Sequence, residues 1–363
     1  MRNRNAAGSA LLVVAMLLGA SCGDGDETSG DGAEAGELVV LQVGGSFGAA
    51  FDAAFLVPYG AETGVAVSQV EGGDDPIAAV RAQVEAGNVQ WDVVDCIPAF
   101  VAANPDVFEE IDREIVTSTN DLVSPTIVGE KFMAINVQAF PLVAYSTEAF
   151  SGEEPEGWAD FFDVERFSGP RGVPDVGLES ASTMPAAALL ADGVPVDELL
   201  PLDLDRAYAK LDELKPDIRV FWTSFVQGSD ILRNGEVVMT VTTDGRGQQL
   251  MAAGEPVGIT YREAFSVPTG LCVPEGSPHV ANAFGFMEFI LSHPEQQAVF
   301  TNLTFYGPVT NEGVALVEEQ GRVSDFSTLH IDEMVPTDTD EWLRYVEENS
   351  DELLNRWNAW VGA

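Results

Sequence analysis

Charged side chains stand at the ends of two predicted strands, where a small charged solute could be held. Asp95 ends the apolar run 91–95, and Asp244 and Arg246 follow the β-branched run 237–242. Open α/β sheets place their ligands at the carboxyl ends of their strands. Asp244 and Arg246 together could clamp a zwitterion, or they could simply pair with each other. Asp95 could equally have a helix-capping or loop role.

A glycine-rich turn follows the first predicted strand, 37–43, and carries Ser46 and Phe47. Backbone N–H groups point outwards at such a turn between a strand and a helix. No Gly-Lys-Ser/Thr follows, so the turn is a weak candidate for a phosphate loop. Phe47 is either an aromatic wall of a ligand site or a residue of the core.

Residue types that carry out acid–base or metal chemistry are scarce in this chain. It has three His and three Cys, with no CxxC or Cys/His spacing of a metal site. No Ser/His/Asp spacing, paired-carboxylate motif or cofactor loop stands out. We therefore expect a protein that is not an enzyme and that holds no cofactor and no metal.

Short apolar runs alternate with helix-patterned segments along most of the chain. Leu204, Ala207, Tyr208 and Leu211 recur at helical spacing before Pro216 ends the pattern. The alternation is typical of α/β lobes, and 363 residues are enough for two of them.

Four short sequence motifs in the middle of the chain resemble those of a known family. They are Trp-x-Asp-Phe-Phe-Asp at 158–163, Phe-x-Gly-x-Arg at 167–171, Ala-Leu-x-Ala-Asp-Gly-Val at 188–194 and Pro-Leu-Asp-x-Asp-Arg-Ala-x-x-x-Leu at 201–211. Together they resemble the spermidine/putrescine-type extracellular solute-binding proteins of ABC importers. The resemblance runs from about Glu37 to about Trp360.

The resemblance implies a two-lobed periplasmic-binding-protein-like fold of type II. Each lobe would be a mostly parallel sheet flanked by helices, and two strands would form the hinge. The expected division is a signal peptide (1–21), a flexible tether (22–36), lobe one (37–143), lobe two (144–265) and lobe one again (266–363). Lobe closure on a small solute, and its delivery to an ABC permease, is the implied function.

Nine residues form the predicted ligand site. Ser180 and Thr183 precede a helix predicted from Ala186, so their hydroxyls either cap that helix or contact the ligand. The whole predicted set is Ser46, Phe47, Asp95, Ser180, Thr183, Trp222, Asp244, Tyr261 and Thr269.

The chain departs from the polyamine pattern where that family holds its cation. The resemblance implies an aromatic followed two residues later by an acid, but this chain has Val267 and Thr269. Thr243 likewise stands where a Trp is expected. Loss of cation–π and charge-assisted contacts weakens recognition of a polyamine. The expected solute is thus polyamine-like or another small amine or amino-acid-like compound; a ferric-ion-binding protein or a non-transport sensor of the same fold is the alternative.

The first residues read as an export signal. Arg2 and Arg4 precede the apolar run 10–18, which is too short to span a bilayer. Small residues then end at Cys22, as in a bacterial lipobox, although Gly19 replaces the usual Leu. We expect a monomeric lipoprotein anchored to a bacterial membrane at the cell surface or in the periplasm; ordinary cleavage and a retained anchor are alternatives.

The charge of the chain is strongly negative, with 59 Asp and Glu against 17 Lys and Arg. Such a field repels nucleic acid and anionic membranes and attracts cations. The acidity either suits a cationic ligand or reflects adaptation to salt or solubility. With Cys22 lipidated, Cys96 and Cys272 remain as a candidate disulfide of an exported protein.

Overall fold

The computed structural model describes residues 36–72, 76–150 and 152–363. The predicted leader, the lipidation at Cys22 and nearly all of the tether lie outside these residues. No helix in the described part is both long and apolar enough to cross a membrane. The described chain holds two β-sheets, each with its own buried apolar cluster, and both belong to one unit of the chain, 35–363.

Lobe one is built on the first sheet, whose strands run in the order β11-β10-β3-β1-β2 with β4 paired to β10. β1 is parallel to β2 and β3, whereas β10 is antiparallel to β3 and β4. The strands are β1 (Glu37–Gln42), β2 (Ala66–Glu71), β3 (Val93–Cys96), β4 (Met133–Ala139), β10 (Phe265–Cys272) and β11 (Val335–Pro336). The helices of this part are α1 (Gly45–Phe51), α2 (Val57–Thr63), α3 (Pro76–Glu85), α4 (Pro98–Ala103), α10 (Val280–Ser292), α11 (Pro294–Thr304) and α12 (Asn311–Gln320), with η1 (Asp52–Leu56), η2 (Pro105–Val107), η3 (Pro125–Ile127) and η6 (Ser327–Glu333).

Lobe two is built on the second sheet, with strand order β7-β6-β8-β5-β9. β6 is parallel to β7 and β8, and β5 is antiparallel to β8 and β9. The strands are β5 (Leu142–Ser146), β6 (Arg171–Pro174), β7 (Ile218–Trp222), β8 (Met239–Thr242) and β9 (Val257–Thr260). The helices are α5 (Trp158–Phe162), α6 (Leu178–Ala191), α7 (Leu204–Leu214), α8 (Phe225–Arg233), α9 (Asp244–Ala252) and α13 (Asp340–Val361), with η4 (Val196–Glu198) and η5 (Lys215–Asp217).

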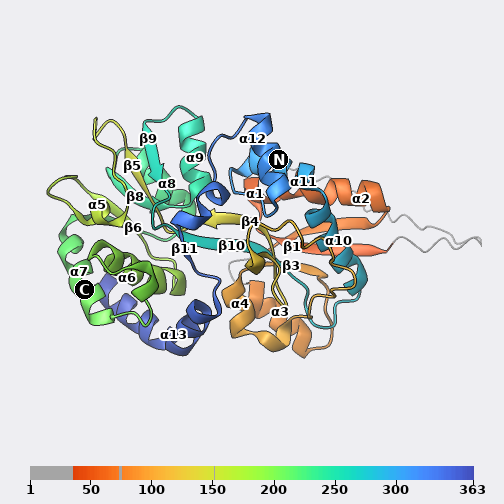
Figure 1. Cartoon of the computed structure of the whole chain (residues 1–363). Coiled ribbons are helices and arrows are strands. Elements are labelled where there is room, and N and C mark those ends of the chain that lie inside the picture. Colours follow the sequence, from red (N-terminus) through yellow and green to blue (C-terminus); the bar gives the residue numbers. More distant parts are fainter. Residues whose placement is uncertain (1–35, 73–75, 151) are drawn as a thin grey trace, which may run out of the picture. The chain divides into compact units, whose positions relative to one another are not determined.

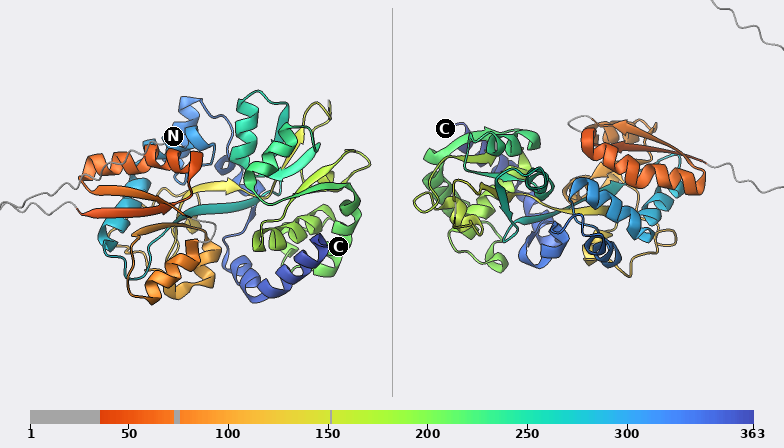
Figure 2. Two further views of the ribbon diagram at one scale, coloured as in Figure 1. Left: turned by 180° about the vertical axis from the view of Figure 1, so that it is seen from behind. Right: turned by 90° about the horizontal axis from the view of Figure 1, so that it is seen from above.

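The chain crosses between the lobes along two neighbouring strands. β4 leads through Phe140 and Pro141 into β5, and β9 leads back into β10, which pairs with β4. Figures 1 and 2 show β4 (yellow) and β10 (teal) side by side on this path. The predicted two-lobed α/β fold is confirmed. Both sheets are mixed rather than mostly parallel, because the crossing strands join them in the antiparallel sense.

The last helix departs from the predicted division of the chain. The predicted division places residues 266–363 in lobe one, but α13 packs on α6 of lobe two (Figure 1). Trp342, Trp357 and Trp360 lie in the buried cluster of lobe two. The Trp357 and Trp360 indole N–H groups donate to Asp175 and Asp212, each at 2.9 Å. The chain therefore crosses a third time, between β11 and α13.

Arg171, the last residue of the Phe-x-Gly-x-Arg motif, is a fully buried cation in lobe two. Its guanidinium donates to the backbone carbonyls of Phe161, Gly169 and Phe167 at 3.0, 2.7 and 2.6 Å. Burial lowers the pKa of this guanidinium to about 10. The three carbonyls take the place of a carboxylate partner and tie α5 and the following loop to β6.

Replacing Arg171 by Ala should lower the free energy of unfolding by about 4 kcal/mol, because three buried carbonyls lose their donors and a cavity remains. Urea unfolding followed by fluorescence measures this. Arg233, which pairs with Asp230 on the surface of α8 at 2.8 Å, is the matched control. Arg233→Ala should cost less than about 1 kcal/mol. Equal losses of unfolding free energy in the two variants would contradict a structural role of the three hydrogen bonds from Arg171 to backbone carbonyls.

Candidate functional site

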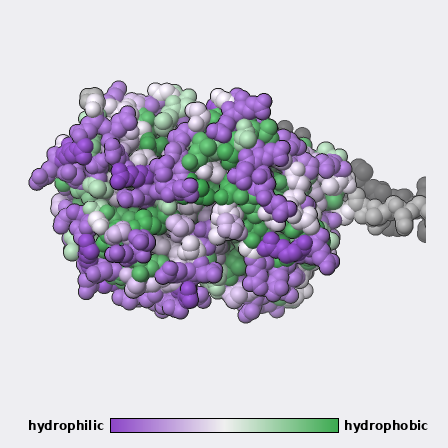
Figure 3. Space-filling model, in the orientation of Figure 1, coloured by the Kyte–Doolittle hydropathy of each residue, from purple (hydrophilic) through white to green (hydrophobic). Residues whose placement is uncertain are grey.

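A cavity of about 300 Å³ lies between α4 of lobe one and α6 and α13 of lobe two. Its walls are mainly apolar. Figure 3 shows several hydrophobic (green) patches on an otherwise largely hydrophilic face. The lining residues are Ile97, Pro98, Ala99, Phe100, Ala103, Val176, Leu178, Glu179, Ser182, Thr183, Val267, Thr337, Trp342, Leu343 and Val346. Such a volume is at the small end of the range for ligand sites in proteins.

The wall from lobe one begins where β3 ends. Ile97 keeps an extended backbone, with φ −124° and ψ 158°, and Pro98 occupies the first position of α4. Proline suits this position because its fixed φ matches a helix and no N–H is needed there. The sequence Cys96-Ile97-Pro98 therefore turns the chain from strand to helix directly at the edge of the sheet.

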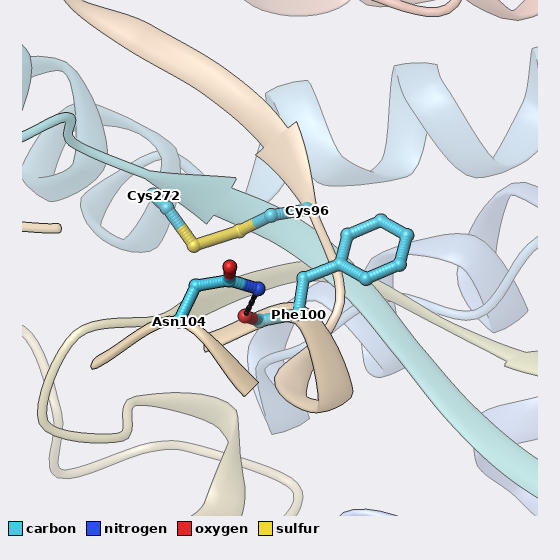
Figure 4. The surroundings of a disulfide bond; sticks show 4 residues. All are labelled: Cys96, Phe100, Asn104 and Cys272. Carbon is cyan, nitrogen blue, oxygen red and sulfur yellow. Dashed lines mark hydrogen bonds between the residues drawn. A yellow bond between two sulfur atoms is a disulfide. The ribbon is translucent and has the colours of Figure 1, made fainter. Parts of the chain in front are cut away.

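A disulfide fixes the base of this wall. Cys96 of β3 and Cys272 of β10 are joined, with their Cα atoms 6.1 Å apart, so the predicted pairing is confirmed. Figure 4 shows the bond beside α4, where the Asn104 side chain donates to the Phe100 carbonyl at 2.8 Å. The bond links the start of α4 to the strand that carries Val267. Two walls of the cavity are thereby held together covalently.

The wall from lobe two is the first turn of α6. The helix begins at Leu178, after Gly177 with φ 69°, and not near Ala186 as predicted. Ser180 and Thr183 therefore lie inside the helix rather than ahead of it. Ser180 Oγ accepts the Val176 N–H at 3.0 Å, and Thr183 Oγ1 donates to the Glu179 carbonyl at 2.7 Å. Thr183 lines the cavity, whereas Ser180 holds the approach to the helix.

Among the described residues that line the cavity, Glu179 is the one with a charged side chain. Burial raises the pKa of its carboxyl to about 7. No residue in the described part of the chain donates a hydrogen bond to this carboxylate or forms an ion pair with it. A cation placed beside it would offset the cost of burying its charge.

Burial also raises the carboxyl pKa of two predicted site residues, Asp95 and Asp244, although neither lines the cavity. Burial raises the pKa of Asp95 to about 7. Burial also raises the pKa of the fully buried Asp244 to about 7, against the opposing effect of hydrogen bonds from Ala139, Ser327 and Gly245. Asp244 Oδ1 accepts the Ala139 N–H at 3.1 Å, which ties α9 to the end of β4.

A second group of residues forms at the start of α9. Thr243 Oγ1 lies 3.3 Å from the Tyr306 hydroxyl, and the Phe47 ring centre lies 6.2 Å from that of Tyr306. Burial and Asp244 raise the pKa of Tyr306, while the charge of nearby Arg246 opposes the rise. Arg246 is half-buried and forms no ion pair with any described residue, Asp244 included.

Other predicted site residues have structural surroundings. Trp222 is fully buried between Phe140 and Phe225 in the core of lobe two and does not line the cavity. Tyr261 is buried and its ring stacks on His330, with centres 4.2 Å apart.

Two further predicted residues lie on the chain of lobe one and its crossing strand. Thr269 pairs with Asn136 in the β10–β4 ladder. Ser46 is exposed in the first turn of α1. Neither residue lines the cavity.

Glu179, Phe100 and Trp342 were missed as site residues. Glu179 carries a partial signal, since an acid in the first turn of a helix complements the helix dipole, but the sequence pattern does not show that the helix begins here. Phe100 and Trp342 have none, because they come from segments 242 positions apart along the chain. In the described residues, no three His, Cys, Asp or Glu side chains form a group that could hold a metal.

The stability of the ligand-free protein should decrease as the pH rises. Unfolded Asp and Glu titrate near pH 4, and a folded pKa of about 7 means that the folded state holds more protons between these values. The contribution is thus present below pH 4 and is lost as the pH rises through 7. Asp244→Asn should reduce the loss of unfolding free energy between pH 5 and pH 8 by about 2–3 kcal/mol.

Chemical unfolding at both pH values measures this difference. Asp351→Asn, at an exposed position of α13, is the control and should leave the pH dependence unchanged. A parallel pH dependence in wild type and Asp244→Asn would show that Asp244 is ionised throughout.

Comparison with known proteins gives a consistent result. Residues 54–322 match the family described as bacterial extracellular solute-binding protein. A gamma-aminobutyric acid-binding protein of Pseudomonas aeruginosa is 30% identical over 339 residues, covering 91% of this chain and 92% of that protein.

Two further similarities are more distant. A putrescine/agmatine-binding protein of Pseudomonas aeruginosa is 22% identical over 272 residues, covering 68% of this chain and 73% of that protein. The crystal structure of an ABC transporter substrate-binding protein from Bradyrhizobium japonicum superposes with a TM-score of 0.77 at 26% identity. It covers 90% of this chain and 99% of the other.

Proposed function

Because the chain belongs to the family of bacterial extracellular solute-binding proteins, we propose that it captures a small amine-bearing solute between its lobes and delivers it to an ABC permease. The observation that carries this proposal is the Glu179 carboxyl in the cavity wall, which has no partner among the described residues. A ligand ammonium would form a charge-assisted hydrogen bond with it and restore its ordinary ionisation.

Among amine-bearing solutes, the surroundings favour an amino-acid-like compound over a polyamine. Val267 and Thr243 stand at the two positions where the polyamine-binding pattern has aromatic groups for cation–π contacts. Arg246, with no carboxylate partner among the described residues, could receive the carboxylate of such a solute. Relatives named for gamma-aminobutyric acid and for putrescine or agmatine support an amine in either case.

Binding would work by closure of the lobes. α4 on one side and α6 with α13 on the other form opposite walls, so a solute between them contacts both lobes only when they approach. A ligand shifts the equilibrium by its preferential affinity for the closed state. The two neighbouring crossing strands provide the axis for that movement.

A panel of solutes measured by thermal shift and calorimetry tests the proposal. It comprises gamma-aminobutyric acid, putrescine, agmatine, glutamate and glucose. At 100 times its Kd, a bound solute adds about 2.7 kcal/mol to the stability of the folded state, which raises Tm by several degrees. We expect at least one amine with a net charge of zero or above to do so. A shift by glucose alone would overturn the proposal.

Export and membrane anchoring complete the proposed role. Acylation of Cys22 would hold the protein at the membrane that carries the permease, with residues 22–36 as a tether. Mass spectrometry of the mature N-terminus tests this. A mature chain that begins elsewhere, or that carries no acyl group, would remove the anchor from the account.

A further inference from the structure

The cavity is larger and less polar than an ammonium site requires. About 300 Å³ corresponds to about ten water-sized groups. Most of the side chains that line it are apolar, among them Phe100, Val176, Val267, Trp342 and Val346. An ammonium and the groups that hold it would leave the greater part of this volume to the rest of the solute.

The hydroxyl groups on the wall already donate hydrogen bonds to backbone carbonyls. Ser182 and Thr183 both donate to the Glu179 carbonyl, at 3.2 and 2.7 Å. Thr337 donates to the Ser266 carbonyl at 2.7 Å. Within the described residues the cavity therefore offers a solute one carboxylate, hydroxyl lone pairs and apolar surface, but no free hydroxyl donor.

We infer that the cavity receives an apolar portion of the solute, of about six to ten non-hydrogen atoms, with the solute's single ammonium at Glu179. This inference rests on the proposed function and narrows its ligand to an amphipathic amine. A second ammonium inside the cavity would be buried without a partner, because Glu179 is the sole charged side chain on the described wall. Burial of an unpaired charge is strongly unfavourable.

A homologous series of amines tests the inference on the full mature protein. Propylamine, hexylamine, phenethylamine and 1,6-diaminohexane are titrated by calorimetry. Affinity should rise about fourfold for each methylene from propylamine to hexylamine, and diaminohexane should bind at least tenfold more weakly than hexylamine. Equal affinities of propylamine and hexylamine, or diaminohexane as the tightest ligand, would overturn the inference and leave the amine site intact. If no amine binds and a neutral solute does, the proposed function itself fails, and the inference with it.

Variants of the wall provide the second measurement. Val346→Phe fills the cavity from α13, and Phe100→Ala removes apolar surface from the partly exposed α4. Each should weaken hexylamine about tenfold and propylamine by a smaller factor. Val226→Phe, on the exposed face of α8, should change neither ligand. If both wall variants lowered the affinities for hexylamine and propylamine by the same factor, the result would contradict an apolar compartment separate from the ammonium site.

Discussion

Replacing Glu179 by Gln should raise the Kd for an amine solute about 10- to 100-fold. The substitution keeps the shape of the side chain but removes the negative charge that would hold the ammonium. Hydrogen bonds to charged groups contribute about 1.5–3 kcal/mol, which gives this range. Isothermal calorimetry with the tightest ligand of the panel measures the effect.

Glu198→Gln is the matched control for this substitution. Glu198 is exposed in η4 of lobe two and does not line the cavity, so its replacement should change the Kd by less than twofold. Both variants should keep the wild-type melting temperature at pH 5, where the Glu179 carboxyl is largely protonated. Wild-type affinity in Glu179→Gln would show that the ammonium is held elsewhere.

Removing the disulfide should have the largest effect on stability. Cys96 and Cys272 are 176 positions apart, so the bond restricts the unfolded chain strongly. The chain-entropy model assigns about 5 kcal/mol to a loop of this length, and measured losses are about 2–5 kcal/mol. The variant Cys96→Ala/Cys272→Ala should lose a corresponding amount of unfolding free energy, seen as a lower midpoint in guanidinium chloride.

A reducing agent separates the bond from the packing of its sulfur atoms. Dithiothreitol should lower the midpoint of the unreduced wild type towards that of the double variant and leave the double variant unchanged. If the wild type does not respond after unfolding in reductant, or if the double variant loses less than 1 kcal/mol, then the bond does not restrict the chain as described.

Much of the fold follows from local patterns. Apolar β-branched runs such as 237–242 locate strands because alternating or continuous apolar side chains fit a buried sheet. The spacing of Leu204, Ala207, Tyr208 and Leu211 locates α7, since these residues fall on one face of a helix and are buried. Such patterns state what an element is and which face it buries.

They do not state which partner the buried face meets. The sequence of α13 indicates an apolar face, and the packing of that face against α6 assigns the helix to lobe two. Trp222 is of a residue type that often binds ligands, yet its ring packs in the core between Phe140 and Phe225. Pairing between distant segments is a property of the whole chain.

The start of α6 explains why the site was only partly predicted. Gly177 adopts φ 69°, a positive value that favours glycine, and the chain turns there into a helix that begins eight residues before the apolar stretch at Ala186. Because the helix starts early, Glu179 lies on the cavity wall. The hydroxyls of Ser182 and Thr183 then donate hydrogen bonds to the Glu179 backbone carbonyl. A pattern of hydroxyl residues ahead of an apolar run cannot distinguish a cap from a first turn.

The crystal structure of the protein with its co-purified solute tests the central claim most directly. The account predicts a solute between α4 and α6, with its nitrogen about 3 Å from the Glu179 carboxylate and its remaining atoms against Val267 and Trp342. A solute bound outside this cavity, or one whose contact with Glu179 lacks a protonated amine, would contradict the account.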